Sequence, residues 1–263
     1  MKELVVLSGK GGTGKTTVVA SLAALAGDKI LVDCDVDAAD LHLLLQPKTL
    51  STNEFWSGET AFIDTKRCTE CSLCLDVCRY GAISDEFEVD PIACEGCGFC
   101  SHICPVNAIE MRENMAGHWF VSETKYGSLV HARLGIAQEN SGKLVATVRQ
   151  NARSLAKDKG LELIISDGPP GIGCPVISSL SGASMALIIT EPTLSGIHDL
   201  ERVIGVCRHF GVTPAVCINK YDINEENVRT IEEDCGRLGI DVIAKLPFDN
   251  VVTEALVRGV PVI

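Results

Sequence analysis

A glycine-rich loop near the amino terminus constrains the fold of this chain more than any other feature. Residues 9–17 fit the pattern G-x-x-x-x-G-K-[ST]. The apolar run Leu4–Leu7 precedes this loop, and a segment rich in Ala, Leu and Val, Thr16–Ala26, follows it. Between a strand and a helix, such glycines let backbone N–H groups face an anion at the amino terminus of the helix. The pattern predicts a phosphate-binding loop that opens a parallel α/β domain.

Short buried strands alternate with helices along most of the chain, which predicts an α/β fold with a mostly parallel sheet. A polar, irregular stretch is expected at Pro47–Gly58, and a hairpin is expected from His118–Val121 and Ser128–Ala132. The expected strands are Leu4–Leu7, Ile30–Val32, Leu161–Ile165, Ala186–Thr190, Ala215–Asn219 and Val242–Lys245, and the later helices are Lys143–Lys157, His198–Phe210 and Glu225–Leu238. We therefore expect one discontinuous domain, residues 1–57 and 119–263, interrupted by a small inserted domain, residues 58–118.

Eight of the 13 cysteines lie in that insert, in two runs of spacing C-x-x-C-x-x-C-x-x-x-C. This is the spacing of bacterial two-cluster ferredoxins, in which the fourth cysteine of each run binds the other cluster. The resemblance implies an α+β ferredoxin-like domain with two [4Fe–4S] clusters. It implies one cluster at Cys68, Cys71, Cys74 and Cys104, and a second at Cys78, Cys94, Cys97 and Cys100.

Zinc is the alternative metal for such cysteines, because Zn²⁺ also takes four thiolates. Zinc sites usually separate two C-x-x-C pairs by a longer loop, so the two uninterrupted runs favour iron–sulfur clusters. Arg79 stands where ferredoxins carry proline after the fourth cysteine of the first run. The remaining cysteines are expected to pack as small apolar residues, although Cys174 lies close enough to Asp167 to keep a metal role open.

The stretch Lys10–Thr16, with its additional lysine, resembles the deviant Walker motif of the MinD/ParA/Mrp ATPases. The resemblance implies a P-loop NTPase fold and a homodimer formed in the presence of ATP, in which Lys10 reaches the partner's nucleotide. A solvated loop lysine is the alternative for Lys10. The loop residues expected to bind ATP or ADP are Gly11, Gly12, Thr13, Gly14, Lys15, Thr16 and Thr17.

The same resemblance assigns roles to residues at the ends of the strands. Lys15 would contact the β- and γ-phosphates, and Mg²⁺ would lie near Thr16, Asp33 and Asp167. Asp35 would orient the attacking water, so the expected catalytic residues are Lys10, Lys15 and Asp35. Adenine-binding positions would be Asn219 and Lys220 on one side and Pro247 and Phe248 on the other. Because Asp222 makes the first segment similar to the NKxD motif of GTPases, guanine remains open.

The charge of the chain bears on its partners. The net charge is −12, and residues 64–113 hold ten acidic and four basic side chains, a balance of −6. An acidic surface repels phosphate backbones, so we expect no nucleic-acid partner. No signal peptide, basic amphipathic tail or apolar run of about 18 residues is evident, so we expect a cytoplasmic protein without membrane contact.

Two functions fit these motifs. In the first, ATP hydrolysis in the dimer is coupled to electron transfer from the clusters to a redox partner. In the second, the chain resembles Mrp-type carriers and serves the assembly of clusters in a client protein. Cluster lability distinguishes the two functions, because only a carrier gives up its clusters.

Overall fold

The computed structural model describes residues 1–135 and 140–263, which divide into two compact units. The first, here called the α/β unit, contains Met1–Asn53, Trp119–Arg133 and Ser141–Ile263. The second, the cysteine-rich unit, contains Glu54–His118 and Leu134–Asn140. Strands β3 (Lys48–Ile63) and β4 (Ile109–Thr124) each begin in one unit and end in the other.

The α/β unit is built on parallel strands within a nine-stranded sheet of order β3-β4-β5-β2-β6-β1-β7-β8-β9. The neighbours from β5 to β9 all pair in parallel, so their carboxyl ends meet at one edge of the sheet. The predicted α/β class with a mostly parallel sheet is therefore confirmed. These strands are β1 (Lys2–Ser8), β2 (Ile30–Asp33), β5 (Gly127–Leu134), β6 (Leu163–Pro170), β7 (Met185–Thr190), β8 (Thr213–Asn219) and β9 (Val242–Leu246).

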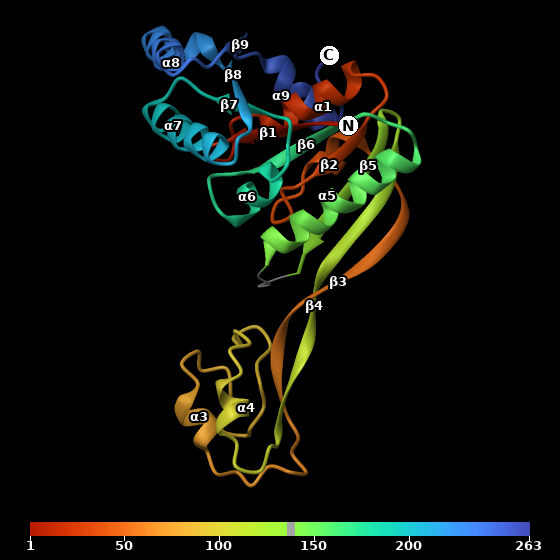
Figure 1. Cartoon of the computed structure of the whole chain (residues 1–263), viewed down its shortest axis with the longest axis vertical. Coiled ribbons are helices and arrows are strands. Elements are labelled where there is room, and N and C mark those ends of the chain that lie inside the picture. The colour runs from red at the N-terminus through yellow and green to blue at the C-terminus, as the bar shows by residue number, and fades with distance from the viewer. Residues whose placement is uncertain (136–139) are drawn as a thin grey trace. The chain divides into compact units, whose positions relative to one another are not determined.

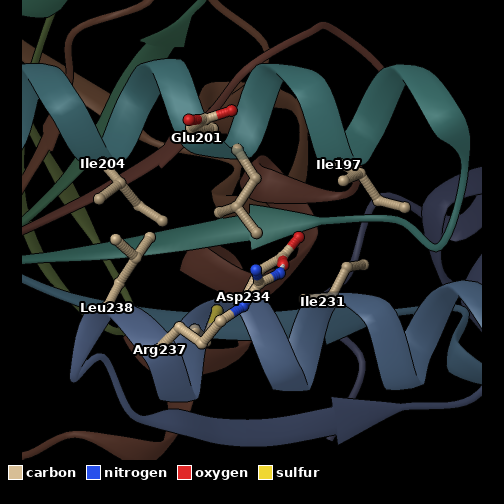
Figure 2. Close-up of a pocket in the computed structure, with 9 residues that line it drawn as sticks. Ile197, Glu201, Ile204, Ile231, Asp234, Arg237 and Leu238 are labelled. Carbon is tan, nitrogen blue, oxygen red and sulfur yellow. Dashed lines mark hydrogen bonds and ion pairs between the residues drawn. The ribbon is translucent and has the colours of Figure 1, made fainter.

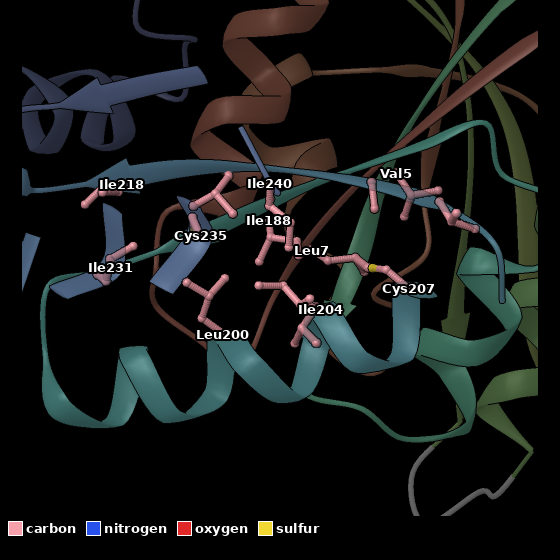
Figure 3. Packing of buried hydrophobic residues seen from close by; sticks show 14 of the residues in the cluster. Val5, Leu7, Ile188, Leu200, Ile204, Cys207, Ile218, Ile231, Cys235 and Ile240 are labelled. Atoms are coloured by element: carbon pink, nitrogen blue, oxygen red, sulfur yellow. The ribbon is translucent and has the colours of Figure 1, made fainter. Parts of the chain in front are cut away.

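Helices cover both faces of this sheet (Figure 1). On one face, α1 (Lys15–Leu25) and α2 (Leu41–Leu45) bury small and branched apolar side chains against β1, β2 and β6. On the other face lie α6 (Cys174–Leu180), α7 (Leu194–His209) and α8 (Glu225–Leu238). Figure 3 shows how Leu200 and Ile204 of α7 approach Leu7 and Ile188 of the sheet. The remaining helices of this unit are α5 (Ser141–Asp158), the 3₁₀ turn Tyr221–Ile223 and α9 (Asn250–Arg258).

A buried ion-pair network joins β1 to α5. Glu3 is 3% exposed, and its carboxylate accepts hydrogen bonds from Arg149 Nε at 2.7 Å and Arg153 Nη2 at 2.7 Å. Arg149 also donates to the carbonyls of Ser178 and Ser181, at the end of α6. Because buried charges are tolerated only when they are paired, this network fixes the position of α5 against the sheet.

The cysteine-rich unit repeats one small motif. Helices α3 (Leu73–Val77) and α4 (Phe99–Ile103) each begin after a residue in the left-handed conformation, Ser72 at φ 63° and Gly98 at φ 72°. The turns that follow the helices repeat a second left-handed residue, Gly81 and then Asn107. Matching backbone conformations at matching places make the two halves of this unit copies of each other.

Three expectations about secondary structure were wrong. Pro47–Gly58 is not irregular, because it lies almost entirely within β3, where Phe55 and Ser57 are buried between exposed neighbours. The strand at Val242–Lys245 exists as β9 but is largely exposed, since it pairs only with β8 at the edge of the sheet. In the α/β unit, helices α2, α6 and α9 were missed because each is short. In the described part of the chain, no helix is long and apolar enough to cross a bilayer.

Candidate nucleotide and iron–sulfur sites

The glycine loop joins the end of β1 to the start of α1, at the edge where the parallel strands end. Gly14 has φ +91°, and a Cβ placed on it would lie 2.5 Å from Asn219 Nδ2. That amide comes from the end of β8 and donates to the carbonyl of Thr13 at 2.8 Å. Glycine is therefore required at position 14, both for the turn of the loop and for the close approach of Asn219.

Acidic and basic side chains converge around the first turn of α1. Lys15 is 6% exposed, and Asp167 at β6 is 1% exposed. Burial raises the pKa of Asp167 to about 7, although a hydrogen bond with Thr16 and the charge of Lys15 act in the opposite direction. A carboxylate that is costly to ionise without a cation is suited to a site that receives a metal ion.

Asp33 and Asp35 lie at and beyond the end of β2. Asp33 is fully buried, and its carboxylate accepts the backbone N–H of Asp35 at 3.0 Å and of Leu41 at 3.2 Å. Burial, and then the nearby charge of Asp167, raise the pKa of Asp33. Burial also raises the pKa of Asp35, opposed chiefly by Lys15. The structure thus brings Lys15, Asp35 and Asp167 within electrostatic reach of one another.

Two buried polar atoms at this edge lack a hydrogen-bond partner among the described residues. They are Thr13 Oγ1, in the glycine loop, and Asp167 Oδ1, at the end of β6. An unpartnered buried polar atom is costly unless a ligand or water completes its hydrogen bonds. The residues at this edge therefore fit a bound nucleotide with a hydrated cation.

The additional lysine of the loop contacts residues that the sequence did not identify. Lys10 Nζ donates to Ser195 Oγ at 3.2 Å and lies 3.7 Å from Glu191 Oε2. The other oxygen of Glu191 accepts from Lys220 Nζ at 2.5 Å. Glu191 directly follows β7, so it lies at the carboxyl edge of the sheet. This position after a buried strand is the sequence feature that could have identified it as a site residue. Within one chain, Glu191 therefore bridges the loop lysine and the segment that follows β8.

The two segments expected to flank the base lie against each other. The backbone N–H of Phe248 donates to Asp222 Oδ1 at 2.7 Å, which joins the Pro247–Phe248 loop to the 3₁₀ turn after Asn219. Asp249 then caps α9, since its side chain accepts from the N–H of Val251. One carboxylate oxygen of Asp222 is thus engaged by the loop.

Two cavities occupy the cysteine-rich unit, and each is lined by four cysteines. One cavity is bordered by Ile63, Phe87 and Ile109, and the other by Tyr80, Ile83 and Phe99. The first contains Cys68, Cys71, Cys74 and Cys104, and the second contains Cys78, Cys94, Cys97 and Cys100. The fourth cysteine of each run therefore faces the cavity formed by the other run.

Backbone hydrogen bonds to sulfur repeat in both halves. The N–H of Ala82 donates to Cys78 Sγ at 3.4 Å, and the N–H of Ala108 donates to Cys104 Sγ at 3.2 Å. Among the described residues, no three His, Cys, Asp or Glu side chains converge on a single metal ion. Four thiols at each cavity are a donor set that fits a [4Fe–4S] cluster.

The other cysteines differ in exposure. Cys34, Cys207, Cys217 and Cys235 are buried, in agreement with the expected packing role. Cys174 is exposed at the start of α6.

A separate groove lies between α7 and α8 (Figure 2). Ile204, Ile231 and Leu238 form apolar walls, and Glu201 and Asp234 lie at its rim. None of its lining residues belongs to the predicted sites.

The fold and the loop at its edge define a P-loop nucleotide-binding α/β protein. The profile of the CobQ/CobB/MinD/ParA nucleotide binding domain matches residues 4–262, so the chain belongs to that family. The uncharacterized protein MJ0578 of Methanocaldococcus jannaschii is 36% identical over 228 residues, covering 86% of this chain and 80% of that protein.

Two further similarities are to a solved structure and to a shorter protein. The septum site-determining protein MinD of Pyrococcus horikoshii, solved with Mg-ADP, has the same fold at a TM-score of 0.59 and 20% identity, covering 99% of this chain and 86% of that chain. The pyruvate synthase subunit PorD of Methanothermobacter marburgensis is 41% identical over 56 residues, which is 21% of this chain and 69% of PorD.

Proposed function

We propose that the chain is an iron–sulfur ATPase that couples a nucleotide-dependent homodimer to electron transfer through two [4Fe–4S] clusters toward a redox partner protein. The observation that carries the proposal is the pair of cavities in the cysteine-rich unit, each lined by one of the two expected ligand sets. The clusters would supply one-electron chemistry at potentials set by burial and by hydrogen bonds to sulfur. The similarity to the pyruvate synthase subunit PorD spans 56 residues, close to the length of the insert.

In this proposal the α/β unit binds ATP with Mg²⁺. Lys15 and the loop N–H groups bind the phosphates, and Thr16, Asp33 and Asp167 hold the cation and its water. Asp35 orients the attacking water, and Lys10 leaves Glu191 to reach the partner's nucleotide. Adenine is the proposed base because Lys10 gives the loop the deviant Walker pattern of the MinD/ParA/Mrp ATPases.

Metal analysis of anaerobically purified protein tests the iron–sulfur assignment. We expect about eight irons and eight acid-labile sulfides per chain, from two [4Fe–4S] clusters. About two zincs and no iron would contradict the proposal.

Paired cysteine variants test the ligand sets. Because each fourth cysteine faces the other run's cavity, Cys78→Ala and Cys97→Ala should perturb the same cluster. Cys104→Ala should perturb the other cluster, as judged by the electron paramagnetic resonance signals of the reduced protein. Cys207→Ala is the control, since this cysteine is buried in the α/β core, and it should leave both signals unchanged. If Cys78→Ala and Cys104→Ala perturbed the same cluster signal, the assignment would be refuted.

Cluster assembly for a client protein is the second candidate function. One cysteine of each set, Cys71 and Cys97, is exposed, which gives an acceptor protein access to each cavity. Transfer of iron and sulfide to an apo-ferredoxin would support assembly. ATP-dependent reduction of an acceptor without loss of iron would support electron transfer.

A further inference from the structure

The segment that follows β2 is anchored at both of its ends. Asp33 holds the N–H of Asp35 and the N–H of Leu41 with the two oxygens of one carboxylate. Leu41 is the first residue of α2 and is fully buried, with Leu44 and Leu45 packed behind it. A displacement of Asp33 or Asp35 by a bound nucleotide is therefore passed directly to α2.

The next residue of α2, His42, connects this helix to the β4–β5 hairpin. The ring of His42 stacks parallel to the ring of His131 on β5, with centroids 6.1 Å apart and planes 8° apart. His131 in turn packs on Phe120 of β4 at 4.9 Å, and His131 Nε2 shares a hydrogen bond with Ser122 Oγ of β4 at 3.0 Å.

His131 is uncharged near neutral pH. His131 is 9% exposed, and burial, followed by the neighbouring His42, lowers its pKa to about 4. Because the His131 ring carries no charge, no like-charge repulsion arises across this contact. Ser122 is fully buried, which fixes the hydrogen bond on the β4 side.

We propose that His131 is a positioning residue that links the Asp33–Asp40 segment to β4 through His42, so that nucleotide binding changes the amide exchange of β4. The inference rests on the proposed function, and it names the contact that couples nucleotide binding to the iron–sulfur clusters. Strand β4 starts at Ile109, inside the cysteine-rich unit, and reaches Phe120 and Ser122 in the α/β unit. The backbone of one strand therefore runs from the stack to Ile109, five residues after Cys104.

Hydrogen–deuterium exchange of the iron-loaded protein tests the link. Exchange of amides 109–124 is compared without nucleotide and with Mg-ATPγS, whose binding is measured separately by calorimetry. Since site-to-site couplings typically amount to about 5- to 150-fold, we expect wild-type exchange in β4 to change at least about fivefold. His131→Ala and His42→Ala should reduce that change to less than about twofold, with the ATPγS Kd kept within about fivefold.

Two further variants separate a link from a purely structural role. His131→Phe keeps a flat ring between His42 and Phe120, so it should restore most of the exchange response. His209→Ala removes a different histidine–phenylalanine contact, with Phe210 at 5.0 Å, and should leave the response unchanged.

The outcomes separate this inference from the proposed function. ATPγS binding with no exchange change in wild-type β4, or with the same change in His131→Ala and His42→Ala, overturns the link alone. Absence of ATPγS binding by the wild-type protein overturns the proposed function and the link with it.

Discussion

The two lysines of the glycine loop have different surroundings, which leads to different expected effects of their removal. Lys15 is 6% exposed and acts electrostatically on Asp35 and Asp167, whereas the side chain of Lys10 is 35% exposed. A hydrogen bond to a charged group contributes about 1.5–3 kcal/mol, so Lys15→Ala should raise the ATP Kd roughly 10- to 150-fold. The exposed contact of Lys10 with Glu191 is worth about 0–1 kcal/mol, so Lys10→Ala should change that Kd less than about fivefold.

Calorimetry and sedimentation velocity on the same preparations measure the difference. Nucleotide affinity should fall in Lys15→Ala, while dimer formation with Mg-ATPγS should be lost in Lys10→Ala even though the nucleotide is bound. Melting temperatures of both variants serve as the control for folding. Equal loss of nucleotide affinity in the two variants, or a normal dimer in Lys10→Ala, would refute the role of Lys10 across the dimer.

Three further predictions concern stability and the loop. Glu3→Gln leaves the buried Arg149 without its counter-charge and should destabilise the chain by about 3–5 kcal/mol in urea unfolding; a loss below about 1 kcal/mol would show that the network contributes little. His131 is neutral when folded and takes up a proton on unfolding below its ordinary pKa of about 6.5, so wild-type stability should fall by about 2 kcal/mol more than that of His131→Phe between pH 7 and pH 5. Parallel pH profiles would contradict the lowered pKa. Gly14→Ala places a Cβ against Asn219 at a left-handed position, at a cost of about 1–3 kcal/mol, and should weaken ATP binding; unchanged binding would disprove the need for glycine there.

Local patterns were sufficient to predict the strand–loop–helix unit, whereas the grouping of the cysteines was implied by the resemblance to two-cluster ferredoxins. The glycine loop is continuous in sequence, so its neighbours, Lys15 and Thr16, follow from the motif. The four cysteines of each cavity come from two runs related by a repeat, which the spacing already contains.

Contacts between distant parts of the chain could not be predicted. The position of Glu191 between Lys10 and Lys220 depends on the order of strands in the sheet, and nothing in the residues around it indicates that order. The stack of His42 on His131 depends on the same arrangement. Strand β3 was missed because polar residues dominate it, and its few buried side chains, such as Phe55, acquire partners only in the folded chain.

A redox titration with and without nucleotide tests the central claim, that ATP binding and the clusters are coupled, most directly. A coupling of about 1–3 kcal/mol corresponds to a shift of roughly 40–130 mV in a one-electron midpoint potential. We predict such a shift when Mg-ATPγS is added to the anaerobic wild-type protein, and none in Lys15→Ala. Identical potentials with and without bound nucleotide, in wild-type protein shown to be dimeric and to contain eight irons, would contradict the account.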